Sequence, residues 1–248
     1  MIEAKNISKS FGDHHVLKNV SVKFEKGKSN LIIGQSGSGK TVLMKCLIGL
    51  YEVDEGHIYF DDRDFSEMSF NERKNVRKEL GMLFQGGALF DYMTVEQNIM
   101  FPLNMFSDMS ILERQKRVDF CLERVNLSKA HKLMPSELSG GMMKRVAIAR
   151  AISLNPEYLF CDEPNSGLDP QTANVIDILI SEITREYNIT TIINTHDMNS
   201  VVEIGDCIAF IYKGELWWEG DKLEILNTEN EEINEFVFSS ELTRKLKE

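Results

Sequence analysis

The segment Gly34-Gln35-Ser36-Gly37-Ser38-Gly39-Lys40-Thr41 decides how the rest of the chain is interpreted. It follows the apolar run 31–33, which is typical of a buried strand, and precedes the helix-like run 42–48. Glycines allow successive backbone N–H groups to turn toward a polyphosphate, and the following helix adds its positive end. In isolation, a Gly/Ser turn is the simpler interpretation. The fixed positions and both flanks together favour a phosphate-binding P-loop.

Each position of this loop has an expected task. Lys40 should reach the β- and γ-phosphates of a nucleotide, and the Thr41 hydroxyl should ligate Mg²⁺. The candidate nucleotide-binding residues of the segment are Gly34, Gln35, Ser36, Gly37, Ser38, Gly39, Lys40, Thr41 and Val42.

Composition narrows the class of protein. The 248 residues suffice for one α/β domain with a sizeable core, or for one domain with an inserted subdomain. The 28 Lys and Arg residues against 39 Asp and Glu residues give a formal net charge of −11. That charge opposes non-specific attraction to nucleic acid and to anionic lipid, so we expect no nucleic-acid partner.

Cysteine usage and hydropathy indicate the compartment. Cys46, Cys121, Cys161 and Cys207 are far apart in apolar surroundings, without CxxC or Cys/His ligand spacing, and are expected in the core under reducing conditions. The sequence contains neither a basic-then-apolar leader nor an apolar run of membrane-spanning length. We therefore expect a soluble, cytoplasmic chain that contacts a membrane only through partners.

Hydrophobic periodicity predicts an alternating α/β chain. The expected strands are 1–8, 16–25 (with Val20, Val22 and Phe24 on one face), 31–33, 57–60, 81–85, 158–161 and 190–194, followed by a hairpin over 207–219 that turns at Lys213-Gly214. The expected helical regions are 71–79, 94–154 and a helix between the last two parallel strands. Its inward face should carry Val175, Ile176, Leu179, Ile180 and Ile183, while Met143, Val146, Ala147 and Ala151 should face inward from 139–154. Alternating βαβ units imply a parallel sheet.

Two carboxylates end the apolar run 158–161. A strand that ends in Asp162-Glu163 delivers both acids to its carboxyl end, which lies beside the P-loop in a doubly wound sheet. Asp162 suits the Mg²⁺ shell, and Glu163 suits polarisation of the attacking water. An acidic turn in solvent is the alternative for an isolated pair, but the P-loop in the same chain argues against it.

The segment Leu138-Ser139-Gly140-Gly141-Met142 predicts a second anion site. Ser139 and the two glycines place a hydroxyl and backbone N–H groups at a helix N-terminus. Read alone, this is an N-capped helix. Two phosphate-binding ends in one chain favour a site shared between two chains.

Taken in order, these segments resemble the Walker motifs and the signature motif of ABC transporter nucleotide-binding subunits, and the resemblance extends end to end. It implies further roles: Phe11 stacks on adenine, Gln85 senses Mg²⁺ and the attacking water, and His196 acts as the switch histidine. Residues 166–169 match the D-loop, including Asp169, and Pro170 reads as the first residue of a capped helix. Each could be an ordinary core or strand-end residue in isolation. The family implies ATP and Mg²⁺ as cofactors, with Thr41, Gln85 and Asp162 around the metal.

Met142 departs from the family pattern, which usually has Gln at this position. With Ser139 as N-cap, Met142 occupies the third helical position and cannot return a hydrogen bond to the cap. ATP contact through Ser139, Gly140 and Gly141 is expected to survive.

Three shorter features resemble the ATPase of Mla/Mce-type phospholipid transporters: residues 84–90, residues 132–137 and Met142. This resemblance implies phospholipid movement between the inner membrane and the outer envelope, driven with an integral permease and an MCE-domain protein. It places the chain on the cytoplasmic face of the inner membrane. Residues 88–90 are then a candidate docking surface for the permease, and a buried loop is the plain structural alternative.

The expected fold is a RecA-like P-loop core with an N-terminal antiparallel β layer and an inserted α-helical subdomain. We expect one ABC ATPase domain over 1–248: a core of 1–87 and 156–220, a helical insertion at 88–155 and an acidic tail at 221–248. Two copies should pair head to tail when ATP is bound. The alternatives are another importer or lipoprotein-release ATPase, or a permease-free ATPase such as an iron–sulfur assembly factor. DNA-repair ATPases are disfavoured because residues 41–161 carry no long heptad arms.

Overall fold

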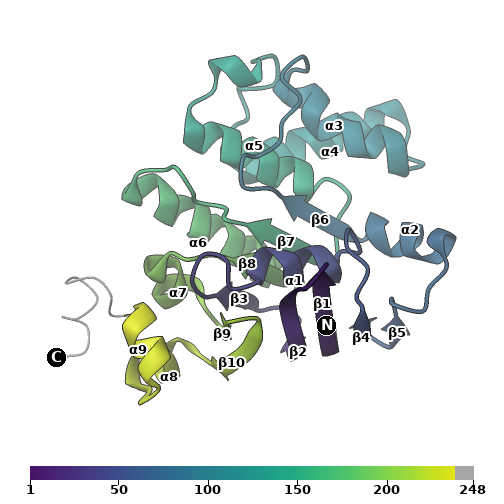
Figure 1. Cartoon of the computed structure of the whole chain (residues 1–248). Helices are drawn as coiled ribbons and strands as arrows, with labels where there is room; N and C mark the ends of the chain where they lie inside the picture. The colour runs from purple at the N-terminus through teal and green to yellow at the C-terminus, as the bar shows by residue number, and fades with distance from the viewer. Residues whose placement is uncertain (238–248) are drawn as a thin grey trace. The chain divides into compact units, whose positions relative to one another are not determined.

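The computed structural model describes residues 1–237 and divides into two compact units, each with a mixed α/β structure. The first unit contains residues 1–73 and the chain from Thr190 onward, and the second contains Lys74–Ile189. Helix α2 (Phe70–Lys78) carries the first boundary between them (Figure 1). The predicted P-loop therefore belongs to the first unit, and the predicted acidic pair to the second.

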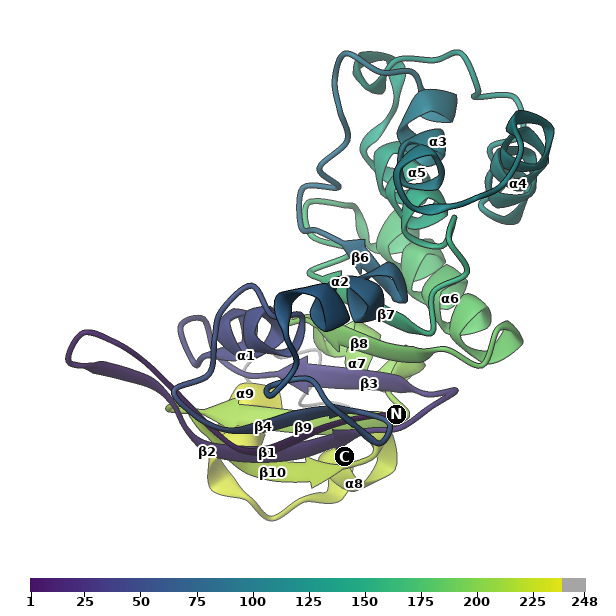
Figure 2. The same cartoon turned by 90° about the vertical axis from the view of Figure 1, so that its right-hand side faces the viewer.

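The first unit contains an antiparallel sheet in the order β2-β1-β4-β5 (Figure 2). Its strands are β1 (Ile2–Phe11), β2 (His14–Phe24), β4 (Glu55–Phe60) and β5 (Arg63–Asp64). Alternation in β2 buries Val20, Val22 and Phe24, as predicted. Strands β1 and β2 are longer than predicted because they continue to the turn at Gly12-Asp13.

Strand β3 (Ser29–Ile33) runs parallel to β8 (Thr190–Asn194) on one side and to β9 (Cys207–Tyr212) on the other. All five residues of β3 are buried, because a central parallel strand is covered on both faces. Its carboxyl end leads into the P-loop and then into α1 (Lys40–Leu47). Strand β10 (Glu215–Gly220) pairs with β9 through the predicted hairpin turn.

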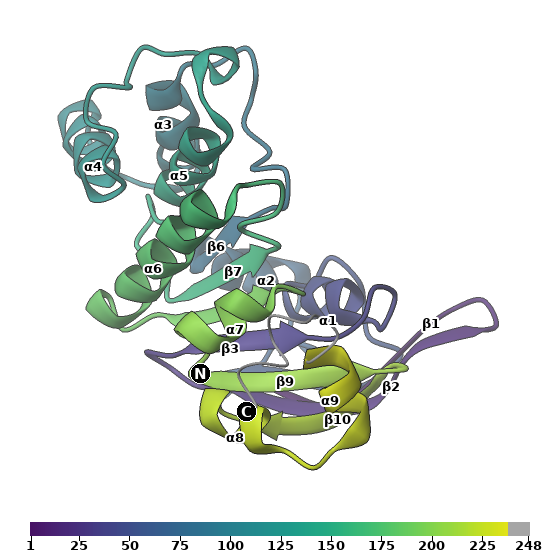
Figure 3. The same ribbon diagram turned by 90° about the vertical axis from the view of Figure 1, so that its left-hand side faces the viewer.

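Three short helices complete the first unit as described. They are α7 (Met198–Ile204), α8 (Lys222–Asn227) and α9 (Glu231–Val237). Figure 3 shows α8 and α9 beside β9 and β10, and Phe236 of α9 packs against Phe210 of β9 at 5.4 Å between ring centroids. The predicted helical tail is confirmed to Val237, and residues 238–248 lie outside the described part of the chain.

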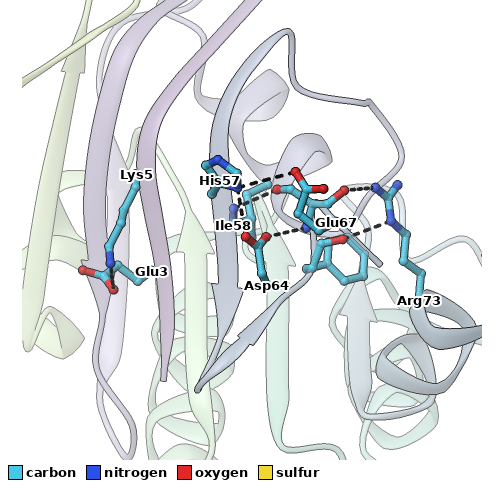
Figure 4. Close-up of polar contacts among 9 residues, drawn as sticks. Glu3, Lys5, His57, Ile58, Asp64, Glu67 and Arg73 are labelled. Atoms are coloured by element: carbon cyan, nitrogen blue, oxygen red, sulfur yellow. Dashed lines mark hydrogen bonds and ion pairs between the residues drawn. The ribbon is translucent and has the colours of Figure 1, made fainter. Parts of the chain in front are cut away.

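Polar contacts join β4, β5 and the start of α2 (Figure 4). His57 Nδ1 lies 2.9 Å from Asp64 Oδ2, and the Ser66 hydroxyl accepts a bond from the Ile58 N–H. Arg73 donates to the carbonyls of Phe65 and Ser66. These bonds attach the β5 edge to the rest of the antiparallel sheet.

The second unit is built on two parallel strands, β6 (Leu80–Leu83) and β7 (Tyr158–Asp162). Its helices are α3 (Val95–Phe106), α4 (Ile111–Arg124), α5 (Gly140–Ala151) and α6 (Pro170–Glu186), with a short 3₁₀ turn at Pro135–Glu137. Helices α3, α4 and α5 contact one another, and α5 also contacts α6. Thr94 and Ser110 begin α3 and α4 with capping boxes. The predicted insertion at 88–155 lies within this unit.

The expected burial was wrong for five residues. Val175 and Met143 are exposed, because each lies outside the buried face of its helix, which the other predicted inward residues do form. Strand β6 ends at Leu83, so Phe84 and Gln85 are exposed loop residues. Cys207 is only half-buried at the start of β9, whereas Cys46, Cys121 and Cys161 are core residues as predicted.

Gly56 provides a test of the antiparallel sheet. It has φ +89°, and a Cβ built there would lie 2.4 Å from the carbonyl oxygens of Lys5 and Asn6 in β1. Gly56→Ala should destabilise the protein by about 3 kcal/mol, because it adds a backbone clash to left-handed strain. Gly12→Ala is the matched control: φ is +59°, nothing lies within 4 Å of the added Cβ, and about 1 kcal/mol is expected. Urea unfolding should give the larger loss for Gly56→Ala, and equal losses would contradict the predicted clash.

Candidate functional site

The P-loop adopts a backbone that only glycine accommodates at Gly34. Its φ is +147°, and a Cβ there would lie 2.2 Å from the carbonyl oxygen of Ile211 in β9. Gly39 precedes α1 at φ +108°, with a Cβ position 3.0 Å from Leu17 and 3.1 Å from the Val16 carbonyl. The loop is therefore pressed against β9 and β2, and its shape is set before any ligand arrives.

The side chain of Lys40 lies within this loop. It is 7% exposed, and its ammonium donates to the carbonyls of Gly34 at 2.8 Å and Gln35 at 3.0 Å. Ser38 is also 7% exposed, and within residues 1–237 its hydroxyl has no hydrogen-bond partner. A buried cation and a buried, unsatisfied hydroxyl beside a helix N-terminus fit a polyphosphate anion.

Residues at the carboxyl ends of neighbouring strands meet the P-loop in the same unit. Asn194, the last residue of β8, donates to the Thr41 hydroxyl at 3.2 Å. This hydrogen bond holds the Thr41 side chain in one orientation, as is common for metal ligands. His196 is exposed two residues further on, just before Asp197 caps α7.

Phe11 lies at the tip of the β1–β2 hairpin and is 45% exposed. Its ring meets Tyr51 edge-on at 5.3 Å, and the Lys9 ammonium lies 5.5 Å from its centroid. Asp54 accepts from Lys9 at 2.6 Å and from the Ser10 N–H at 2.6 Å. These contacts hold an exposed aromatic ring in one orientation, which suits stacking against a planar base.

In the second unit, Asp162 is the last residue of β7 and Glu163 follows it with φ +50°. A non-glycine residue in this left-handed region is uncommon and strained. Both side chains are half-buried. The β-strand conformation therefore ends at Asp162, and the chain changes direction at Glu163.

The predicted N-caps are both confirmed. The Ser139 hydroxyl accepts from the Met142 N–H at 3.3 Å, and Met142 occupies the third position of α5, as expected. Asp169 caps α6, accepting from the Gln171 and Thr172 N–H groups at 3.1 and 3.0 Å. Hydrogen bonds from Thr172, its hydroxyl first, hold the pKa of Asp169 below its usual range. Ser139, Gly140 and Asp169 remain exposed.

Two basic residues of α5 hold the loop that contains Gln85. Lys144 donates to the carbonyls of Gln85 and Glu163, and Arg150 donates to those of Gly87 and Ala88, both at 2.7 Å. Sequence reasoning missed Lys144, Arg150 and Asn194. Lys144 did leave a signal, because it shares a helical stripe with the buried Ala147 and Ile148.

A separate cavity of about 380 Å³ lies in the first unit at the amino end of β3. Lys28, Cys207 and Glu219 are among its lining residues, and burial raises the pKa of both Cys207 and Glu219. None of the predicted nucleotide-binding residues lines it. It lies at the opposite end of β3 from the P-loop.

Comparisons with known proteins bear on this arrangement. A family model described as ABC transporter matches residues 17–166, more than half of the chain. The chain belongs to the ABC transporter family. As an ABC ATPase, it hydrolyses ATP, and that hydrolysis is coupled to transport.

The relatives of this ABC ATPase are named for transport systems with different substrates. It is 41% identical to the methionine import ATP-binding protein MetN of Clostridioides difficile, over 91% of this chain and 70% of the relative. It is 38% identical to the intermembrane phospholipid transport ATP-binding protein MlaF of Haemophilus influenzae, over 96% of this chain and 90% of the relative. Among solved structures, it superposes with a TM-score of 0.80 on the cassette MJ0796, a post-hydrolysis dimer bound to ADP and Pi. That match has 32% identity and covers 90% of this chain and 99% of the other.

The fold predicted for the ABC ATPase is confirmed by these neighbours. Within residues 1–237, the structure contains no helix with the length and apolar character that crossing a bilayer requires.

Lys40→Ala tests the anion cradle. The substitution removes the buried ammonium and its charge-assisted contacts, so affinity for MgATP should fall roughly 10- to 100-fold. Equilibrium titration with a fluorescent ATP analogue measures the loss. Lys18→Ala, an exposed position on β2, is the matched control and should bind as the wild type does. Equal affinities for all three proteins would contradict the assignment of Lys40.

Proposed function

We propose that residues 34–42 hold the triphosphate of ATP, with Lys40 reaching the β- and γ-phosphates and Phe11 stacked on adenine. The single observation that carries this is a preformed loop that contains both the buried Lys40 ammonium and, among the described residues 1–237, a buried Ser38 hydroxyl without a hydrogen-bond partner. Mg²⁺ is assigned to Thr41, Gln85 and Asp162 from the family motifs and from the preference of Mg²⁺ for oxygen ligands. Bound Mg²⁺ would neutralise charge that develops on the phosphates.

Glu163 is proposed as the residue that orients or deprotonates the attacking water. Gln85 positions the same water, and His196 donates to the γ-phosphate. The support for Glu163 is its place directly after β7, in a strained conformation of the kind that clusters at active sites. We assign the helical insertion at 88–155 the task of presenting Ser139.

Two copies of the chain are proposed to close head to tail around two ATP molecules. The dimeric state of the MJ0796 cassette supports this. Ser139, Gly140, Gly141 and Asp169 would then meet the nucleotide held by the partner's P-loop. Ser139, Gly140 and Asp169 are exposed in the single chain, as a partner contact requires.

The transported substrate is proposed to be phospholipid, moved between the inner membrane and the outer envelope. Support comes from residues 84–90, residues 132–137 and Met142, and from the MlaF relative aligned over 96% of the chain. Such a system includes an integral permease and an MCE-domain protein, and the chain is peripheral on the cytoplasmic face. Methionine import is the second candidate, because the MetN relative has the higher identity, 41%.

The proposed permease contact centres on the loop after β6. Phe90 is itself packed in this unit, 4.8 Å from Phe101 and below the Arg150 guanidinium, so it anchors the loop. Tyr92 is 74% exposed and Phe84 41% exposed. Exposed aromatic side chains beside a packed one fit an apolar docking surface.

Glu163→Gln should bind MgATP with wild-type affinity and hydrolyse it at least ~100-fold more slowly, because the amide cannot accept a proton. The variant should accumulate as a dimer with ATP in analytical ultracentrifugation. Glu157→Gln, an exposed glutamate before the same strand, is the control and should turn over normally. Near-normal turnover by Glu163→Gln would refute the role of Glu163.

Mixing variants tests the shared site. Lys40→Ala and Ser139→Arg should each lack ATPase activity alone. A heterodimer places both lesions in one site and leaves the other intact, so activity should partly return on mixing. If heterodimers form, as shown by differently tagged subunits, and activity stays absent, the head-to-tail site is wrong.

Tyr92→Asp should weaken co-purification with the permease and leave ATP binding unchanged, because it places a charge in an apolar contact. Leu223→Asp, at an apolar position 67% exposed in the other unit, is the matched control. The intact complex in liposomes should transfer labelled phospholipid when ATP is added. Transfer of methionine and no phospholipid would favour the second candidate and leave the ATPase assignment standing.

A further inference from the structure

Lys144 occupies an unusual place for a lysine. It lies in the middle of α5, is 6% exposed, and belongs to the helix face that also buries Ala147 and Ile148. Desolvation lowers the pKa of its ammonium, and the nearby Cys161, Glu163 and Asp162 act in the opposite direction. An apolar residue at this position would avoid the cost of burying an amine, so the polar contacts of Lys144 need a reason.

Those contacts join two loops that are far apart in sequence. The ammonium donates to the carbonyl of Gln85, two residues after β6, and to the carbonyl of Glu163 at 3.3 Å, directly after β7. Strands β6 and β7 are parallel neighbours, so both loops leave the same edge of the second unit. One side chain thus links the Gln85 and Glu163 backbones just beyond the end of the β6–β7 pairing.

Both loops need such a restraint. Glu163 has the left-handed φ of +50°, which persists only where surrounding contacts hold it. The Gln85 side chain is exposed, and its loop runs through Gly86 and Gly87. Arg150, less than two turns after Lys144, holds the far side of this loop through the carbonyls of Gly87 and Ala88. Two side chains of α5 therefore hydrogen-bond to the Gln85 loop, and one of them, Lys144, also bonds to the Glu163 carbonyl.

The same helix begins at the Ser139 cap. Five residues separate Ser139 from Lys144, which is about 7.5 Å of helix rise. A hydrogen-bonded helix moves as one piece over this length, so displacement of the Ser139 end is transmitted to the Gln85 and Glu163 carbonyls.

We propose that Lys144 is a positioning residue for ATP hydrolysis: from α5, it sets the placement of the Gln85 loop and of Glu163 relative to each other. This inference rests on the proposed roles of Gln85 and Glu163. Lys144 itself touches neither nucleotide nor water in this scheme. Its effect is on kcat, because ATP binding depends on the P-loop in the first unit.

The test compares Lys144→Met, which keeps the length of the side chain and removes the donor, with Lys144→Arg, which keeps charge and donors. Lys144→Met should lower kcat ~100-fold, the effect of a misplacement of about 1 Å, with MgATP affinity within about threefold of wild type. Lys144→Arg should recover part of the lost rate. Lys129→Met, an exposed lysine of the same unit, is the control and should retain full turnover.

Thermal unfolding of each variant distinguishes misplacement of the Gln85 and Glu163 loops from a general loss of folding stability. If Lys144→Met does not fold, Lys144→Gln takes its place, because its shorter amide donor cannot span both carbonyls, and kcat should fall ~10-fold or more. A folded Lys144→Met or Lys144→Gln protein with wild-type kcat overturns the inference. Equal loss in Lys144→Met and Lys144→Arg, with melting temperatures lowered in parallel, also overturns it, because that pattern marks a purely structural role.

A double variant distinguishes this inference from the proposed function. In the Glu163→Gln background, Lys144→Met should reduce the residual rate by a much smaller factor than the ~100-fold expected in the wild type, because Glu163, one of the two groups that Lys144 positions, is already disabled. If Glu163→Gln alone turns over normally, the proposed role of Glu163 fails. If Glu163→Gln is inactive and Lys144→Met is fully active, only the positioning role fails.

Discussion

The close approach of the P-loop to β9 is the constraint on which the first unit depends. The Ile211 carbonyl occupies the space where any side chain of residue 34 would lie. In the turn between β9 and β10, the Gly214 N–H donates to the Ser38 carbonyl at 3.1 Å, and the Gly214 carbonyl accepts from the Lys18 N–H at 2.8 Å. The loop is therefore fastened to β2 and to the β9–β10 turn. A loop that is already ordered loses little conformational entropy when it binds phosphate. The free-energy cost of ordering the loop therefore does not weaken the affinity.

In the second unit, one helix holds the loops that follow β6 and β7. Helix α5 begins at an exposed cap, carries three basic side chains that are buried or half-buried, and contacts α3, α4 and α6. Burial lowers the pKa of both Lys144 and Arg150, and backbone carbonyl oxygens accept hydrogen bonds from both side chains. Such polar contacts in a core contribute little net stability but specify one arrangement of the loops they join.

Local patterns in the sequence were sufficient for the nucleotide motifs and the fold. The P-loop, the Ser139 and Asp169 caps and the hairpin at Lys213-Gly214 depend on residues close together in the chain, so their spacing predicts them. Val175, Met143 and Cys207 were misplaced because burial depends on which neighbour packs against an element. The left-handed Glu163 and the contacts of Lys144 depend on loops separated by tens of residues. Only the tertiary structure shows such contacts. A lysine on an apolar helical stripe does indicate, from sequence alone, that a buried polar contact is present.

The central claim is that this chain hydrolyses ATP as a pair of copies with shared sites. The most direct measurement is the specific ATPase activity of the purified chain with MgATP as a function of protein concentration, with sedimentation velocity at each point. Activity per chain should rise with concentration, reach a plateau as the ATP-bound dimer forms, and disappear when EDTA removes Mg²⁺. Constant activity per chain over a range in which the protein stays monomeric would contradict it.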